Sequence, residues 1–370
     1  MSKNNIYDGK PSVELDHRPF FSIVVACYNS AVYLERLLNS IIQQHMNDDI
    51  EVILSDDHST EDYQFIVDKY NQDLCIRQIQ TDYNFAPGNT REKGCTIATG
   101  EWLTFADQDD FFIDDSLIQI KNQILEMGEK YHVVANFYEV KDYTYEVIRE
   151  MTATRNWCHA KFYNMDNLWR AYDIHFKKDL RTHEDIYISS VVMCILNTLN
   201  GDRPLYSETF CYNWVANVNS ISRTEYNNTN FVENFFEDYL TATIGVCKET
   251  YLAGKITRRY ALEKTIDVIL YCYFYIQRFK FARPKDYVKS NIDKVSEYYK
   301  LLKNILVFSN KDVYESARLR DADWYIAVRD SAALGVGPCI EQDTLEQFLK
   351  ILDDDGYEKC LIDWNSINFM

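Results

Sequence analysis

Short apolar runs alternate with amphipathic helical segments along the first third of this 370-residue chain. Hydrophobic residues recur with helical spacing over Ala31–Gln44, between the first two apolar runs. Strand–helix alternation at such short intervals predicts a mostly parallel sheet with helices on both faces. The four runs, each short and apolar enough for a buried strand, are Phe21–Cys27, Ile50–Leu54, Cys75–Ile79 and the stretch that begins at Trp102.

The fourth run, Trp102–Asp110 (WLTFADQDD), ends abruptly in acidic residues. Carboxylates beside a buried strand are costly unless a positive charge compensates them, and clustered oxygen ligands suit Mg²⁺ or Mn²⁺. A solvated acidic turn is the alternative interpretation. Tyr28-Asn29 and Asp56-Asp57 also follow strands directly. The carboxyl edge of the predicted sheet, where ligands of such folds bind, therefore gathers three polar groups.

Charge and cysteine usage narrow the class of protein. The net charge is −18 with a pI near 4.8, which argues against binding to a nucleic-acid backbone or electrostatic docking on an anionic membrane. Ten cysteines are scattered without a CxxC pair, as expected of reduced core residues. The N-terminus lacks a signal-peptide pattern, and no apolar run reaches membrane-spanning length. We expect a cytoplasmic protein, with peripheral contact at the inner membrane face left open.

Five segments in a fixed order carry a family resemblance. They are SIVVACYNS (22–30), EVILSDDHSTED (51–62), the helix start at Arg91, FADQDD (105–110) and HEDIYIS (183–189). Together they resemble the inverting family 2 glycosyltransferases of GT-A fold. The chain departs from the usual pattern at Ala26, where proline is common, and at His58, where glycine is commoner.

The resemblance implies an α/β fold: a GT-A (nucleotide-diphospho-sugar transferase, Rossmann-like) domain followed by a mainly helical C-terminal domain. From about residue 230 the sequence changes to long amphipathic helices, which would bind acceptor or mediate homo-oligomerisation. The expected organisation is a flexible lead-in over 1–19, the glycosyltransferase domain over 20–228 and the helical domain over 229–370.

The resemblance also implies a donor site. Tyr28 would lie against a nucleotide base, and Asp57 would accept a hydrogen bond from its imide, which fits uracil and hence a UDP-sugar. Asp109 would bind the metal, Mn²⁺ or Mg²⁺, that neutralises the leaving diphosphate. Asp110 would support that site or cap the following turn. The nucleotide-binding residues implied in this way are Ala26, Tyr28, Asp57, Arg91, Asp107 and Gln108.

Inverting transfer needs one carboxylate to deprotonate the acceptor hydroxyl. Asp185 aligns with the catalytic Asp of the family, with Glu184 beside it and His183 as a further acceptor contact. An acidic helix N-terminus, favoured by the helix dipole, is the local alternative. Trp157, His159 and Trp214 are weaker candidates for acceptor contacts.

The predicted activity is that of a metal-dependent hexosyltransferase of polysaccharide or glycoconjugate biosynthesis. Its acceptor would be a glycan, a lipid-linked intermediate or a protein. The QxxRW motif of processive synthases is absent, which indicates a non-processive enzyme. A non-catalytic sugar-nucleotide or glycan-binding module on the same scaffold is the alternative, with a nucleotidyltransferase a weaker one.

Overall fold

The structure, a computed structural model, describes residues 7–84, 86–152, 157–176, 180, 183–199 and 203–217. By its contacts the chain divides into two units, Met1–Ala242 and Thr243–Met370, and every described residue lies in the first. The expected helical domain over 229–370 therefore lies outside the described residues.

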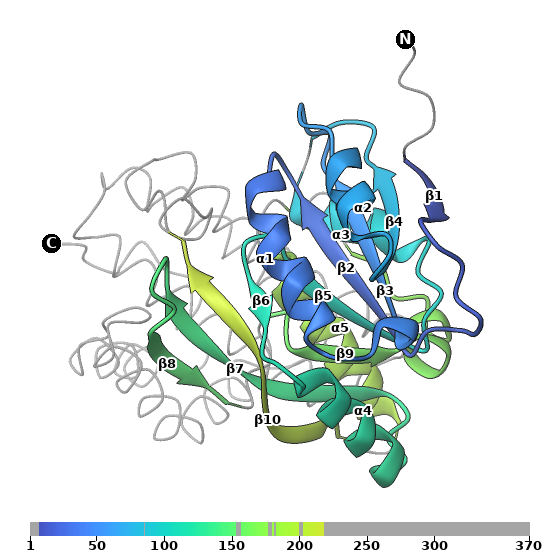
Figure 1. Cartoon of the computed structure of the whole chain (residues 1–370). Helices are drawn as coiled ribbons and strands as arrows, with labels where there is room; N and C mark the ends of the chain where they lie inside the picture. The colour runs from blue at the N-terminus through green and yellow to red at the C-terminus, as the bar shows by residue number, and fades with distance from the viewer. Residues whose placement is uncertain are drawn as a thin grey trace, which may run out of the picture. The chain divides into compact units, whose positions relative to one another are not determined.

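The centre of the described unit is one mixed β-sheet of order β1-β4-β3-β2-β5-β9-β7-β10-β6, with β8 paired to β7 (Figure 1). Neighbours among β4, β3, β2 and β5 are parallel, whereas β9 runs antiparallel to both β5 and β7. The strands are β1 Asp8–Pro11, β2 Phe21–Cys27, β3 Ile50–Asp56, β4 Cys75–Gln80, β5 Trp102–Asp107, β6 Phe111–Phe112, β7 His132–Lys141, β8 Val147–Met151, β9 Lys161–Asn164 and β10 Leu205–Ala216.

Helices cover both faces of the sheet, as the alternation predicts. Ile23 and Val25 of β2 join the buried cluster that includes α1, α2 and α4, while Val24 joins the one that includes α5. This division follows from the two-residue period of a strand. Figure 1 shows α1 and α2 in front of the parallel strands. The helices are α1 Ala31–Ile42, α2 Gln64–Tyr70, α3 Pro87–Cys95, α4 Ser116–Met127 and α5 Glu184–Thr198, with a 3-10 turn over Asn47–Asp49 and a π-helix over Met165–Arg170.

Two expectations about the sheet need correction. The sheet is mixed: the pairs among β2, β3, β4 and β5 and the pair β7–β10 are parallel, whereas β1, β6, β8 and β9 pair antiparallel with their neighbours. The sequence analysis also placed residues 1–19 in a flexible lead-in, whereas Asp8–Pro11 forms β1 and pairs with β4. Short strands of this kind carry little hydrophobic periodicity, so whether they form depends on backbone pairing with a strand that is distant in sequence.

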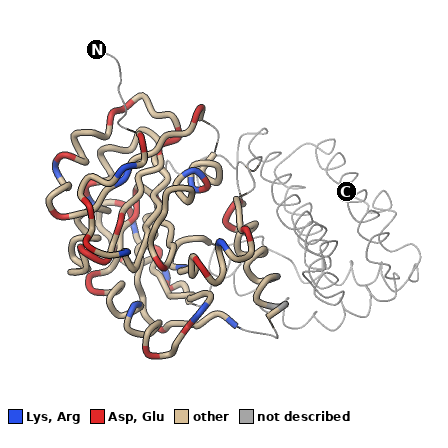
Figure 2. Tube along the Cα trace, turned by 90° about the vertical axis from the view of Figure 1, so that its right-hand side faces the viewer, with Lys and Arg blue, Asp and Glu red and all other residues tan. Residues whose placement is uncertain are grey.

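Lys and Arg lie scattered among the more numerous Asp and Glu positions in Figure 2. Within the described ranges, we find no helix with the length and apolar character needed to cross a bilayer.

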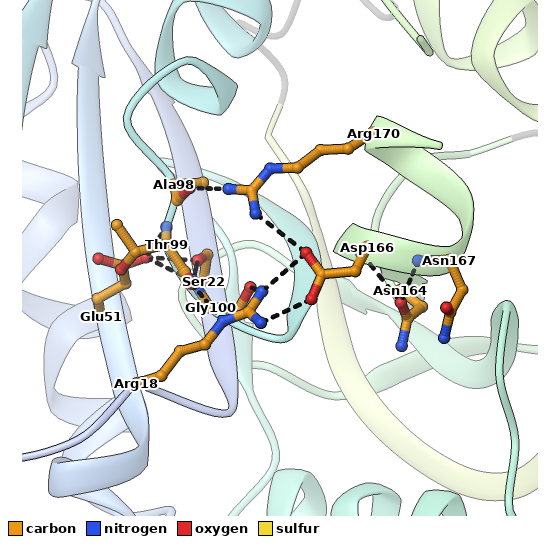
Figure 3. Close-up of polar contacts among 10 residues, drawn as sticks. All are labelled: Arg18, Ser22, Glu51, Ala98, Thr99, Gly100, Asn164, Asp166, Asn167 and Arg170. Atoms are coloured by element: carbon orange, nitrogen blue, oxygen red, sulfur yellow. Dashed lines mark hydrogen bonds and ion pairs between the residues drawn. The ribbon is translucent and has the colours of Figure 1, made fainter. Parts of the chain in front are cut away.

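Arg18 ties the lead-in to the amino edge of the sheet (Figure 3). Its guanidinium donates to the carbonyl oxygens of Thr99 and Gly100, each at 2.7 Å, and pairs with Asp166 at 2.6 Å. Arg170 donates to the other oxygen of Asp166 at 3.1 Å. The segment before β2, the turn before β5 and the π-helix are thereby joined at the edge opposite the strand ends that carry the acidic residues.

Glu51 is a fully buried carboxylate at the same edge. Its Oε1 accepts from the Ser22 hydroxyl and from the backbone N–H groups of Thr99 and Gly100, at 2.5, 2.5 and 3.1 Å. Its Oε2 accepts from Nε of Arg77 at 2.7 Å. Gly100 is required here because a Cβ would lie 2.6 Å from the Ser22 hydroxyl oxygen. One side chain therefore fixes the relative positions of β2, β3, β4 and the turn into β5.

We expect Glu51→Ala to destabilise the protein by about 3–5 kcal/mol, because it removes a buried carboxylate that pairs with the partly buried Arg77 and accepts from the Ser22 hydroxyl and two backbone amides. Chemical denaturation of the full chain, followed by circular dichroism, measures this loss. Glu146→Ala is the control, since Glu146 forms an exposed pair with Lys141 and its removal should leave the midpoint unchanged. An equal midpoint for Glu51→Ala and wild type contradicts the role given to Glu51.

Candidate active site

The carboxyl ends of β2, β3 and β5 meet at the point where the strand order reverses. Ala26 in β2 lies in register with Ser55 of β3 on one side and Asp107 of β5 on the other. Strands β3 and β4 extend the sheet in one direction from β2, and β5 begins the other half. Ligands of open α/β sheets bind at such a switch point. The segments after these strands, which carry Tyr28, Asp57 and the acidic loop, are therefore brought together as predicted.

Tyr28 and Asp57 differ in exposure. The Tyr28 side chain is 48% exposed, and its backbone N–H donates to Oε1 of Gln108 at 2.7 Å. Asp57 is 7% exposed, and its Oδ1 accepts from the Thr81 hydroxyl at 3.2 Å. An exposed ring beside a held carboxylate suits stacking on a planar group and acceptance from a donor on its edge. The nucleotide contacts themselves stay predictions.

Arg91 joins the acidic loop to the second acidic motif. Its guanidinium, only 4% exposed in α3, pairs with Oδ1 of Asp107 and with Oε1 of Glu184, each at 2.5 Å. Burial would raise the pKa of Asp107, but the charge and hydrogen bond of Arg91 outweigh it and lower that pKa below its usual value. The sequence analysis expected Arg91 to face the diphosphate, and that contact stays a prediction.

Gly88 permits the approach of the two helices that carry this bridge. A Cβ at Gly88 in α3 would lie 2.9 Å from the Cβ of Glu184 in α5. Any side chain there would push α5 away from α3 and lengthen the pair between Arg91 and Glu184. The glycine therefore belongs to the geometry of the site, although it carries no chemistry.

The acidic loop after β5 is anchored on three sides. Oδ2 of Asp109 accepts from the side-chain amide of Asn217 at 2.8 Å. Oδ1 of Asp110 accepts from the backbone N–H of Val215 at 2.8 Å. The carbonyl of Asp109 accepts from Arg36, whose guanidinium lies over the ring of Tyr145. The motifs did not point to Arg36, because its position on the polar side of an amphipathic helix carries no chemical signature.

Burial dominates the titration of this loop. It raises the pKa of Asp109, and it raises that of Asp110 well above its usual value, with the charges of neighbouring aspartates adding to the effect. Because burial disfavours the ionised form of these two carboxyl groups, a positive charge nearby would stabilise that form.

An imidazole completes a candidate metal group with two of these carboxylates. One ligand atom each from Asp107, Asp110 and His159 lie within 4.8 Å of one another. Oδ2 of Asp110 and Nε2 of His159 are buried, and neither has a hydrogen-bond partner. Buried metal-ligand atoms without hydrogen-bond partners fit a cation, which would coordinate both the oxygen and the nitrogen. Asp109, the ligand expected from the sequence, is outside this group and stays a prediction.

Trp157, His159 and Trp214, the weaker acceptor candidates, lie together, and His159 is itself part of the candidate metal group. The ring of His159 stacks with that of Tyr212, at 5.0 Å, and with those of Trp157 and Trp214, at 6.4 and 6.1 Å. Burial lowers the pKa of His159 to about 3, so its ring is neutral. Contact of Trp157 or Trp214 with an acceptor stays a prediction.

Asp185 lies in the first turn of α5, directly after Glu184. Burial, and after it the charge of Glu184, raises the pKa of Asp185 to about 8, while Arg91 opposes the shift. A raised pKa is the property that a carboxylate needs to take a proton from a hydroxyl near neutral pH. His183 precedes the helix with a φ of 61°, and burial lowers its pKa to about 3. Its predicted role as an acceptor contact is not tested by these contacts.

A family model and a solved structure agree on the class of fold to which this chain is similar. The model of glycosyl transferase family 2 matches residues 22–197 of this chain. The mixed Rossmann-like sheet is the GT-A fold, as the sequence analysis predicted.

Curated relatives match over about a hundred residues. Poly(ribitol-phosphate) beta-N-acetylglucosaminyltransferase TarS of Staphylococcus aureus is 36% identical over 99 residues, which are 26% of this chain and 17% of the relative. The UDP-Glc:alpha-D-GlcNAc-diphosphoundecaprenol beta-1,3-glucosyltransferase WfaP of Escherichia coli is 30% identical over 128 residues, 33% of this chain and 47% of the relative. The chain therefore spans less than half the length of these relatives.

A solved structure agrees on the fold. The crystal structure of S. aureus TarS residues 1–349 in complex with UDP-GlcNAc superposes with a TM-score of 0.62 and 20% sequence identity. The match covers 85% of this chain and 92% of that one.

The raised pKa of Asp185 predicts a stability effect with a definite sign. Between its ordinary value of 3.8 and about 8, the folded state holds this proton more tightly than the unfolded state, so ionisation opposes folding as pH rises. We expect Asp185→Asn to raise the melting temperature of the nucleotide-free protein, by more at about pH 8 than at about pH 5. Asp73→Asn, in an exposed turn, is the control. A variant that melts below wild type at the higher pH contradicts the burial of this carboxylate.

Proposed function

We propose that this protein is a metal-dependent, inverting glycosyltransferase that moves a sugar from a UDP-sugar to a hydroxyl of a glycan, lipid-linked or protein acceptor. The observation that carries the proposal is the Arg91 bridge, which joins the acidic loop after β5 to the Glu184-Asp185 motif in one site. The two motifs are more than seventy residues apart in sequence and serve the two halves of this reaction, leaving-group departure and acceptor activation.

The donor lies, in this proposal, across the carboxyl ends of β2, β3 and β5. The exposed ring of Tyr28 stacks on the base, and Asp57 accepts from the imide of uracil. Gln108 keeps the backbone at Tyr28 in place through its hydrogen bond. The donor in the name of the E. coli relative, UDP-Glc, supports a uridine nucleotide.

Asp185 acts as the general base. Its carboxylate takes the proton of the acceptor hydroxyl while the hydroxyl oxygen attacks the anomeric carbon from the side opposite the leaving diphosphate. One displacement inverts the configuration, so an α-linked donor yields a β-linked product. The beta linkages in the names of both relatives support this stereochemistry. Glu184 raises the proton affinity of the base and is itself held by Arg91.

The cation is part of the proposal because Oδ2 of Asp110 in the acidic loop and Nε2 of His159 are buried without hydrogen-bond partners. When bound, a divalent metal supplies Lewis-acid neutralisation of the charge that develops on the diphosphate. The residues available to hold it are Asp107, Asp109, Asp110 and His159.

We place the reaction in the cytoplasm, as a non-processive step of polysaccharide or glycoconjugate assembly. Cys27, Cys75, Cys95, Cys158 and Cys211 are free thiols, which suits a reducing compartment.

UDP together with Mn²⁺ is expected to raise the melting temperature, whereas UDP alone should act weakly. A ligand at a hundred times its Kd stabilises the native state by about 2.7 kcal/mol, which a thermal-shift assay resolves. GDP and CDP with Mn²⁺ are the matched controls. A larger shift with either of them overturns the role of Asp57, and no shift with any nucleotide favours a glycan-binding module instead.

Asp185→Asn is expected to lower the rate of sugar transfer by about 10²–10⁴-fold, as loss of a general base does. Its affinity for UDP with Mn²⁺ should stay close to that of wild type, because the amide keeps the shape of the site. Release of UDP from a panel of UDP-sugars with candidate acceptors measures the rate, with Asp73→Asn as control. Full transfer in Asp185→Asn would remove Asp185 from the mechanism.

A further inference from the structure

His159 lies where its ring nitrogen meets two carboxylates. Its backbone forms a parallel bridge with Phe105 of β5, two residues before Asp107. A loop far from the acidic motif in sequence is thereby held against the end of that strand. The result is the group of Asp107, Asp110 and His159, whose ligand atoms lie within 4.8 Å of one another.

Packing fixes the orientation of this imidazole. The ring of Tyr212 lies nearly parallel to it at 5.0 Å, and the indoles of Trp157 and Trp214 lie roughly parallel to it at 6.4 and 6.1 Å. The ring of Phe137 meets it edge-on at 4.5 Å. A ring packed in this way keeps its nitrogens pointed in fixed directions, as a preorganised ligand does.

One ring nitrogen of His159 and one carboxylate oxygen of Asp110 have no hydrogen-bond partner. His159 is 3% exposed, and its Nε2 is buried without a hydrogen bond. Asp110 is 1% exposed, and its Oδ2 is likewise without a partner. Buried polar atoms are almost always paired, so two of them in one group indicate something that the protein alone does not supply. A proton on His159 would satisfy one atom, but a cation satisfies both at once.

We propose that Asp107, Asp110 and His159 bind a divalent transition-metal ion, with Nε2 of His159 as a nitrogen ligand. Asp107 forms the open side of the group, since a third of its side chain is exposed (33%). Three protein ligands leave positions for the phosphate oxygens of a donor, as catalytic metal sites do.

The nitrogen ligand selects the ion. Mg²⁺ prefers oxygen ligands in a strict octahedron and seldom takes imidazole, whereas transition metals accept it readily. We therefore assign Mn²⁺ rather than Mg²⁺ to this enzyme. The link to a sugar nucleotide rests on the proposed function, but the binding of the ion does not.

This ligand set differs from the one that the sequence motif implies. The motif assigns the metal to Asp109, whose Oδ2 is already occupied by the amide of Asn217 at 2.8 Å. Asp110 would instead serve as a ligand, with its other oxygen fixed by the backbone of Val215.

The test is electron spin-echo envelope modulation of Mn²⁺ bound to the full chain, without nucleotide. We expect modulation from a ¹⁴N nucleus, which changes to that of ¹⁵N when the protein is made with ¹⁵N-histidine. In His159→Gln the nitrogen modulation should vanish, and the Kd for Mn²⁺ should rise about tenfold or more. The preference for Mn²⁺ over Mg²⁺, measured by competition, should fall in the same variant.

His132→Gln is the matched control. His132 is also buried, at 5% exposure, and also stacks on a tyrosine, Tyr163, but it is not in the metal group. The nitrogen modulation should persist in this variant. If His159→Gln does not fold, the ¹⁵N-histidine comparison in wild type and in His132→Gln decides the question without it.

The outcomes separate this inference from the proposed function. Mn²⁺ that binds wild type without nitrogen modulation overturns His159 as a ligand, and so does a protein that takes up no Mn²⁺ in the absence of nucleotide. If either result accompanies Mn²⁺-dependent transfer from a UDP-sugar, the proposed function stands and this inference fails. Nitrogen-ligated Mn²⁺ without any transfer keeps the inference and removes the proposed function.

Discussion

The candidate site depends on one buried guanidinium. Arg91 lies between Asp107 and Glu184 and is in contact with both. A charge buried to this extent is tolerated only because two carboxylates oppose it, and each carboxylate is in turn held by the arginine. The bridge fixes α3 to the end of β5 and to the start of α5. The distance between the acidic loop and Asp185, on which any transfer reaction depends, follows from this contact.

The sheet supplies the frame on which the bridge is built. In-register pairing of Ala26 with Ser55 and Asp107 brings three chain segments to one edge. At the opposite edge Glu51 and Arg18 hold the same strands together through buried and half-buried hydrogen bonds (Figure 3). Rigid strands between two fixed edges position the loop side chains more accurately than the loops could by themselves. The aromatic rings around His159 likewise hold its imidazole in position next to the acidic loop.

Periodicity and motif order predicted the parts of the fold that depend on local sequence. The strands β2, β3 and β5 and the helix α1 lie where apolar spacing placed them, and the polar residues at the strand ends converge as expected. The pattern failed for β1 and β9, which are four residues each and owe their existence to pairing with distant strands. It also did not find Arg36, whose role arises from contact with a carbonyl 73 residues away.

The sequence by itself determined the class of fold, the edge of the sheet that carries the candidate site and the acidic residues that are candidates for donor binding and for the base. It did so because hydrophobic spacing and strand-end polarity are local properties of the chain. Only the tertiary structure decided that Arg91 is shared between Asp107 and Glu184, that Asp185 is buried enough for burial to raise its pKa, and that His159 meets Asp107 and Asp110. These facts depend on which side chains exclude water and which distant groups share a buried space, and no stretch of sequence contains that information.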